Sequence, residues 1–107
     1  MSLKDSLAAM VAEKVRAVEV PEWGRTVHVR QLGAAAVADL HDRRLGPDFV
    51  PLLVVHGACE PDGSPAFAAA DLDFVRDVLP GLGTLRVAQA VADLNKLTES
   101  EADAKNG

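Results

Sequence analysis

Few residues in this chain have the types and spacing that chemistry requires. His56 and Cys59 are three residues apart, a spacing that a metal ion could use. A closed zinc site takes about four Cys or His ligands, and the chain has one cysteine and three histidines. We therefore expect no metal site, and burial at the end of a helix accounts better for this pair.

Cys59 could also serve as a nucleophile. It would need His28, His41 or His56 to hold it as a thiolate, and a third group to orient that histidine. Nothing in the surrounding sequence indicates an electropositive pocket, and buried free cysteines are common without any function. A small cysteine-dependent enzyme is one alternative, which alkylation of Cys59 would test, but we expect no enzymatic activity.

Two further segments have residues typical of ligand sites. Asp71, Asp73 and Asp77 are spaced so that a helix spreads them around its axis, and they lack the pattern of a calcium loop. The run Gly81-Leu82-Gly83-Thr84 has glycines before a helix but not the lysine or length of a phosphate loop. We expect helix-end charges at the first, an ordinary turn before a Thr84 helix cap at the second, and no cofactor.

The composition limits the class of protein. With 107 residues, of which 49% are hydrophobic, the chain is long enough for one domain with one core. Sixteen acidic residues against eleven basic ones give a net charge of −5, which disfavours binding to nucleic acid or to anionic membranes. The single cysteine suits a reducing compartment. Neither a signal peptide pattern nor an apolar run of about 20 residues is present, so we expect a cytosolic protein.

The first two elements follow from periodicity. Ser2 is a helix cap, and the residues Leu3, Leu7, Met10 and Val11 then recur along one stripe, which predicts a helix over Leu3–Arg16. Two alternating runs follow, separated by Pro21-Glu22-Trp23-Gly24, and they predict an antiparallel hairpin. Its core-facing residues are predicted to be Val18, Val20, Val27 and Val29. Its solvent-facing residues are predicted to be Glu19, Thr26, His28 and Arg30.

The remainder of the chain favours helices. We predict one over Gly33–Arg44 and another over residues 48–56, although that apolar run could instead be a buried strand. Gly57–Ser64 is predicted to be a loop with Asp62-Gly63 at a tight turn, and Ala69–Val75 to start a short third or fourth helix. A last helix is predicted from Thr84 to Leu97, with an apolar stripe of Leu85, Ala88, Val91, Ala92 and Leu94.

Together these elements predict a mainly helical α+β domain over residues 1–97, with a small antiparallel hairpin sheet. We expect it to contain one helix, the hairpin and three further helices. Residues 98–107 hold three acidic residues and no large apolar one, which predicts a flexible polar tail.

Two signatures and their order resemble a known family. The first is Val-Pro-Glu-Trp-Gly with Val-His-Val-Arg after it, and the second is Cys-Glu-Pro-Asp-Gly-Ser-Pro-Ala-Phe after an apolar segment. An alanine-rich helix lies between them, and a short acidic helix and a long final helix follow. Over about residues 18–97 this order is similar to the tail assembly chaperones of long-tailed bacteriophages and prophages.

The resemblance implies a non-enzymatic role in the cytoplasm of a bacterial host and absence from the mature virion. It implies that the chain coats the long, largely helical tape measure protein and keeps it soluble until tail tube subunits polymerise around it. It also implies that a longer form, made by ribosomal frameshifting, recruits the tail tube protein. Weak self-association into a homo-oligomer is a further expectation.

The family has no catalytic motif, so candidate contact residues come from size and position alone. They are the large apolar residues at element ends, Trp23, Phe67, Phe74 and Leu85. A tryptophan at the end of a hairpin commonly covers the edge of the core, and tryptophan is also enriched in binding interfaces, so both roles are compatible. The alternative function is a small acidic cytosolic adaptor or regulatory domain, of the antitoxin or anti-repressor type.

Overall fold

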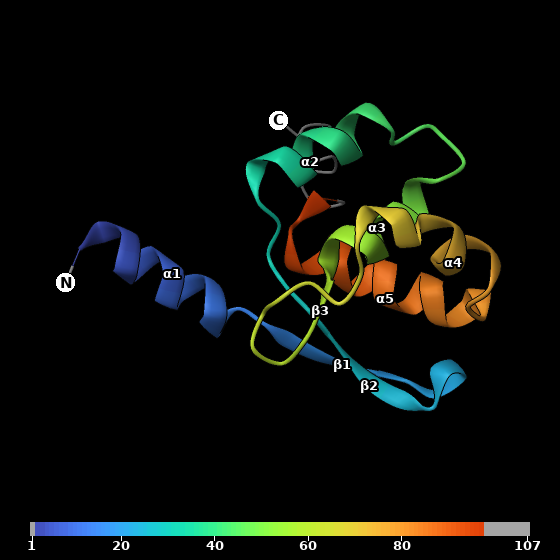
Figure 1. Ribbon diagram of the computed structural model, residues 1–107, viewed down its shortest axis with the longest axis horizontal. Helices are drawn as coiled ribbons and strands as arrows, with labels where there is room; N and C mark the ends of the chain where they lie inside the picture. The colour runs from blue at the N-terminus through green and yellow to red at the C-terminus, as the bar shows by residue number, and fades with distance from the viewer. Residues whose placement is uncertain (1, 98–107) are drawn as a thin grey trace, which may run out of the picture.

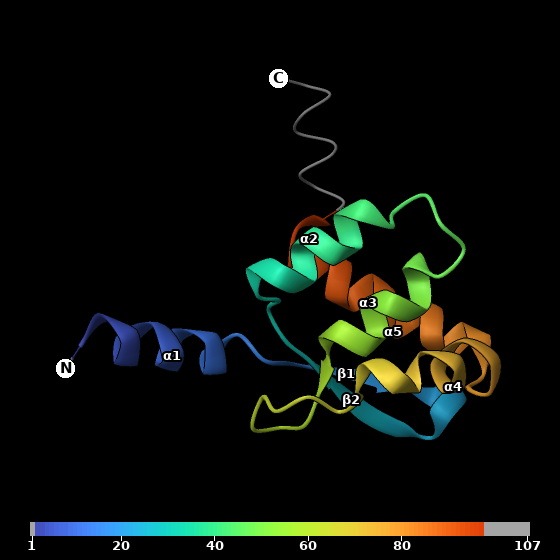
Figure 2. The ribbon, with the colours of Figure 1, turned by 45° about the horizontal axis from the view of Figure 1, so that its top comes forward.

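The computed structural model describes residues 2–97, so the predicted tail over 98–107 lies outside the described residues. Helix α1 (Leu3–Glu13) begins where predicted and ends three residues early. The Ser2 hydroxyl oxygen accepts a hydrogen bond from the Asp5 backbone N–H at 3.1 Å, as the sequence predicts for a helix cap. None of the residues of α1 is buried. Figures 1 and 2 both show α1 projecting from the rest of the molecule.

The hairpin forms as predicted. Strand β1 (Arg16–Val20) leads through a 3-10 turn, η1 (Pro21–Trp23), into strand β2 (Arg25–Val29). The strands pair antiparallel with Val18 opposite Val27. Gly24, at φ +66°, makes the left-handed step between η1 and β2. Val20 and Val29 are fully buried, and Val18 and Val27 pack partly buried against the core, so the predicted core face is confirmed.

A third strand was missed within the segment predicted to be a loop. β3 (Ala58–Cys59) pairs antiparallel with β2, giving the sheet order β1-β2-β3. Two residues are too few to show an alternating pattern, so periodicity could not reveal this strand.

This strand corrects the prediction that His28 and Arg30 point to solvent. Both are half-buried, and His28 lies opposite Cys59. The Arg30 guanidinium donates hydrogen bonds to the carbonyls of His56 at 3.3 and 3.4 Å and of Gly63 at 3.3 Å. The end of α3 and the loop after β3 therefore provide the acceptors that solvent was expected to provide.

Four α-helices follow the hairpin within residues 2–97, one in each of the four segments where a helix was predicted, although the domain was expected to hold three further helices. They are α2 (Ala34–Asp42), α3 (Phe49–Gly57), α4 (Leu72–Asp77), preceded by the 3-10 turn η2 (Ala69–Asp71), and α5 (Gly81–Leu94). The short acidic segment forms a short helix, as the pattern over Ala69–Val75 predicted. The uncertain apolar run is a helix, so the prediction for residues 48–56 is confirmed over its alternative. The fold is therefore α+β and mainly helical, as predicted.

The core lies between α3, α5 and the sheet. α3 is apolar almost throughout, and residues 51–55 and Gly57 are all buried. It packs along α5 at close range. A Cβ added at Gly57 would collide with the Val91 methyl groups, so glycine permits the close approach of the two helices. Figure 1 shows α3 and α5 beside each other in the helical part of the molecule, with α2 and α4 around them.

The start of α5 differs from its prediction. α5 begins at Gly81 after Pro80, and Thr84 is a buried residue inside the helix whose hydroxyl donates to the Pro80 carbonyl at 3.5 Å. The side of α5 that packs inward is made of Gly83, Thr84, Val87, Ala88, Val91 and Ala92. Ala88, Val91 and Ala92 were predicted correctly. Leu85 was not, because its side chain is 52% exposed.

The end of α5 is tied to the segment after the hairpin. The Asn95 side-chain oxygen accepts a hydrogen bond from the Leu32 backbone N–H at 2.8 Å, and its amide nitrogen donates to the Arg30 carbonyl at 3.2 Å. The same nitrogen donates to the Val91 carbonyl at 2.9 Å. One side chain thus satisfies backbone groups of two segments. No helix among residues 2–97 has the length and apolar character to cross a membrane.

Candidate functional site

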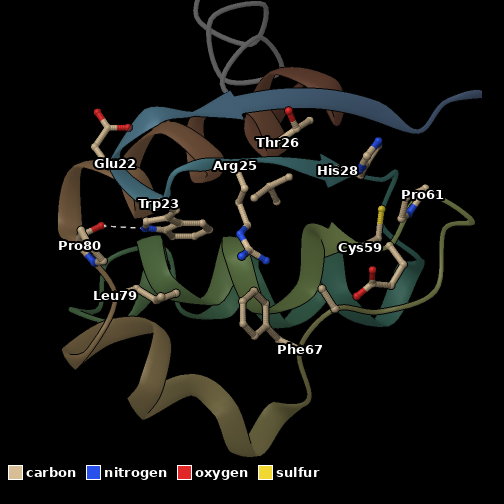
Figure 3. A pocket seen from close by; sticks show the side chains of 13 residues that line it. Glu22, Trp23, Arg25, Thr26, His28, Cys59, Pro61, Phe67, Leu79 and Pro80 are labelled. Atoms are coloured by element: carbon tan, nitrogen blue, oxygen red, sulfur yellow. Dashed lines mark hydrogen bonds between the residues drawn. The ribbon is translucent and has the colours of Figure 1, made fainter.

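The largest groove that we describe lies beside the hairpin end, between segments that are far apart in sequence (Figure 3). Its volume is about 750 Å³. We call it the Trp23 groove. Its walls come from η1, β2, β3 and the loops on either side of α4. The lining residues are Glu22, Trp23, Arg25, Thr26, Val27, His28, Cys59, Glu60, Pro61, Ala66, Phe67, Leu79 and Pro80.

Trp23 forms one wall and also fastens the hairpin to α5. Its indole Nε1 donates to the Pro80 carbonyl at 3.2 Å. The ring lies over Gly83, where an added Cβ would overlap the indole nitrogen and come within 2.7 Å of Cδ1. Glycine at this position therefore permits the contact. The groove wall at Trp23 is held in place by a hydrogen bond and by close packing.

An ion pair next to Trp23 strengthens the same junction. The Arg86 guanidinium donates two hydrogen bonds to the Glu22 carboxylate, at 2.9 and 3.0 Å. These hydrogen bonds lower the pKa of Glu22. Because two parallel bonds fix relative orientation as well as distance, Glu22 and Trp23 together attach the hairpin end to the first turns of α5.

Phe67 stands on the opposite wall, at the end of a tightly held loop. The Glu60 N–H donates to the Ser64 carbonyl at 2.8 Å and Gly63, at φ +91°, makes the turn. The Asp62 carboxylate accepts from the Ser64 N–H at 2.9 Å and from its hydroxyl at 2.7 Å, and these bonds lower the pKa of Asp62. The predicted tight turn is confirmed, and it leads directly to Phe67.

The groove has no activated nucleophile in the part of the chain that the structure describes. The Cys59 thiol is buried, and this burial is the main reason why its pKa is raised. A nucleophilic cysteine needs the opposite change. Among residues 2–97, no three His, Cys, Asp or Glu side chains gather where a metal ion could be held. The groove can bind apolar side chains at its walls, with charged groups at intervals along it.

Of the four predicted contact residues, the structure brings two together. Trp23 and Phe67, far apart in sequence, line the same groove and are half-buried. Phe74 on α4 and Leu85 on α5 do not line it, and their side chains are 46% and 52% exposed. Sequence reasoning missed Arg25, Val27 and Leu79. Val27 had been assigned to the core alone, and no pattern indicated that the other two faced a groove.

Phe74 and Leu85 belong instead to two exposed apolar pairs. Phe74 and Val78 are one helical turn apart at the end of α4, and Leu82 and Leu85 are one turn apart at the start of α5. All four side chains are exposed. We call these residues the α4–α5 surface. Spacing by one turn was a usable signal in the sequence, since it places each pair on one side of its helix.

Comparison with known proteins finds a likeness in fold rather than in sequence family. Neither a protein-family model nor a curated protein matches this sequence. The fold is similar to the solved structure of the bacteriophage HK97 tail assembly chaperone, with a TM-score of 0.58 and 24% sequence identity. The similarity covers 75% of this chain and 79% of the HK97 chain. At this identity the likeness shows that the two proteins share a fold.

Proposed function

We propose that this chain is a tail assembly chaperone of a phage or prophage, and that it binds the tape measure protein and keeps it soluble in the bacterial cytoplasm. The observation that supports this most is the fold, shared with the HK97 tail assembly chaperone over about three quarters of both chains. The role is non-enzymatic and ends before the virion is complete.

The apolar surface of the molecule supports the same proposal. A chaperone for an amphipathic rod needs exposed apolar side chains that an apolar helix face can contact. The Trp23 groove, the α4–α5 surface and the apolar stripe of α1 each offer such side chains. The net charge of −5 would keep the resulting complex in solution. Trp23, Phe67, Phe74 and Leu85 are the proposed contact residues.

The test is co-expression with the tape measure protein encoded near this chain. We expect the wild-type chain to move that protein from the insoluble to the soluble fraction. Phe67→Ser probes the groove, and a Phe74→Ser, Leu85→Ser double variant probes the α4–α5 surface. Leu45→Ser is the control, because Leu45 is 95% exposed and lies outside both sites.

We expect at least one of the two probing variants to lose solubilisation of the tape measure protein. The control should solubilise it as well as the wild type does. A wild-type chain that fails to solubilise its own tape measure protein would contradict the proposal. Recovery of the chain from purified virions would contradict it as well. Trp23 is not a suitable first target, because its replacement would detach the hairpin from α5.

A further inference from the structure

The arginines of this chain divide into two groups. Of seven, five form an ion pair or donate a hydrogen bond to a carboxylate or a carbonyl within the described residues. They are Arg16, Arg30, Arg43, Arg76 and Arg86. Arg25 and Arg44 have no such partner among residues 2–97. Arg44 lies in the exposed segment between α2 and α3, whereas Arg25 lines the Trp23 groove.

Arg25 is an exposed cation that lines the Trp23 groove and has no ion-pair partner among residues 2–97. Figure 3 shows its side chain reaching toward the space between Trp23 and Phe67. Two neighbouring polar groups are already used, since Glu22 pairs with Arg86 and the Trp23 N–H donates to the Pro80 carbonyl. Between Trp23 and Phe67, the Arg25 guanidinium is therefore the charged group that is available to a bound molecule.

The chemistry of this site defines what could occupy it. A guanidinium binds a carboxylate through two parallel hydrogen bonds, and this pairing strengthens when water is excluded by apolar neighbours. Phosphate is the alternative anion that a guanidinium binds. It is disfavoured here because the protein has a net charge of −5 and repels a nucleic acid backbone. The apolar walls then require large aliphatic or aromatic groups next to the carboxylate.

We propose that the Trp23 groove binds a protein segment that places an Asp or Glu against Arg25 and large apolar side chains against Trp23 and Phe67. The inference rests on the proposed function, in which that segment belongs to the tape measure protein. Glu60, also in the groove lining, has no ion pair among the described residues. Its charge disfavours a second acid of the bound segment at that place.

The experiment uses overlapping 20-residue peptides that cover the tape measure protein encoded near this chain, with binding measured for the full chain. The variant is Arg25→Glu. The matched control is Arg44→Glu, which makes the same charge change at the other arginine without a partner. Thermal unfolding should be alike for both variants and the wild type, because neither side chain makes a hydrogen bond within residues 2–97.

We expect the bound peptides to carry Asp or Glu within one helical turn of Leu, Ile, Val or Phe. Arg25→Glu should weaken their binding by about tenfold or more, and Arg44→Glu should leave it within about twofold. Changing the peptide acid to Arg should restore binding to Arg25→Glu. Equal loss in both variants, or bound peptides without an acid, would overturn the inference.

The outcomes separate this inference from the proposed function. If the tape measure protein is solubilised and its peptides bind Arg25→Glu as well as the wild type, the groove assignment is wrong and the chaperone role stands. If no peptide binds and no solubilisation occurs, the proposed function itself fails. Binding of single-stranded DNA that Arg25→Glu abolishes, or self-association that it abolishes, would assign the groove to another occupant and overturn the inference.

Discussion

Helices α1 and α5 both have apolar residues repeating along one side, and the structure uses them in opposite ways. α5 buries six of its fourteen residues against α3 and the hairpin, whereas α1 buries none of its eleven. Only the last turns of α1, at Met10 and Val11, come near the body, beside Leu32 and Leu94. An apolar stripe therefore predicts a helix, but the surface that covers the stripe depends on the rest of the fold.

The difference also concerns stability. Isolated helices shorter than about 12–15 residues are marginal in water, and α1 is supported by its Ser2 cap, by the chain that continues into β1, and by Met10 and Val11 at its end. Its Leu3 side chain is 75% exposed. We therefore expect α1 to contribute little to the stability of the domain and to be the part most readily changed by a partner.

The largest effect should come from placing the same charge on each helix. Val91→Asp puts an unpaired carboxylate into the core, where Val91 is fully buried, and should cost about 4 kcal/mol or more of unfolding free energy. Leu7→Asp on α1 should cost about 0.5 kcal/mol or less. Urea unfolding followed by circular dichroism measures both. Similar losses in the two variants would mean that α1 packs against the body in solution.

Two glycines of α5, Gly83 and Gly81, test whether the packing of Trp23 holds the hairpin to this helix. Gly83→Ala would displace the Trp23 ring from α5 and should destabilise the domain by about 1–3 kcal/mol. Gly81→Ala, in the same helix, meets nothing within 4 Å and should stabilise it by about 0.4–1 kcal/mol. Thermal unfolding measures the opposite signs. If both substitutions stabilised the protein, the packing of Trp23 on Gly83 would be refuted.

The end of α5 allows a smaller test. Asn95→Ala removes the acceptor for the Leu32 N–H and the donor to the Arg30 carbonyl, which should cost about 1–2 kcal/mol. Asn95→Asp keeps an acceptor for the Leu32 N–H, but it sets a carboxylate oxygen against the Arg30 and Val91 carbonyls, so it should also destabilise the domain while leaving the Leu32 N–H bonded. Amide hydrogen exchange at Leu32 measures the difference, because only the alanine variant leaves that N–H without its partner. Unchanged exchange at Leu32 in the alanine variant would argue against this link.

The smallest effect concerns α2, whose attachment to α3 is partly polar. The Asp39 carboxylate lies 2.9 Å from His56 Nε2 and 3.1 Å from Arg43 Nε. The hydrogen bond with His56 is the main reason why the pKa of Asp39 is below its usual value of 3.8. The contribution of Asp39 is therefore present above that value and is lost as the pH falls through the lowered pKa.

This pH dependence can be measured by thermal unfolding between pH 6 and pH 2. The wild type should lose more stability across that range than Asp39→Asn, which has no charge to lose, and the difference should be small because Asp39 is partly exposed to solvent. The α1 variant Leu7→Asp is unsuitable as a control here, since it adds a carboxylate. Leu7→Ser serves instead and should follow the wild-type curve.

Local patterns predicted much of the fold because local physics determines those parts. The valines of the hairpin, the Ser2 cap and the Asp62-Gly63 turn each depend on residues a few positions apart. Thr84 misled the prediction because threonine favours helix caps, whereas here its small side chain is needed inside the helix. β3 could not be predicted, since its two residues become a strand only when β2 lies beside them.

The candidate site was predictable only in part, for the same reason. Trp23 and Phe67 were identified as large apolar residues at element ends, but the groove that joins them exists only after the hairpin and the loop after β3 meet. Arg25 has no distinctive sequence neighbourhood. Its role in our inference comes from the absence of an ion-pair partner among the described residues, which is a property of the folded chain.

The chain contains one tryptophan, and that residue both walls the groove and holds the hairpin to α5. Its indole emission is therefore a built-in optical reporter of events at this place. A molecule entering the groove changes the polarity around the ring, and detachment of the hairpin exposes the ring to water. Ligand titrations can consequently be followed by intrinsic fluorescence on the unlabelled protein. Unfolding in denaturant provides the reference spectrum of Trp23 exposed to water.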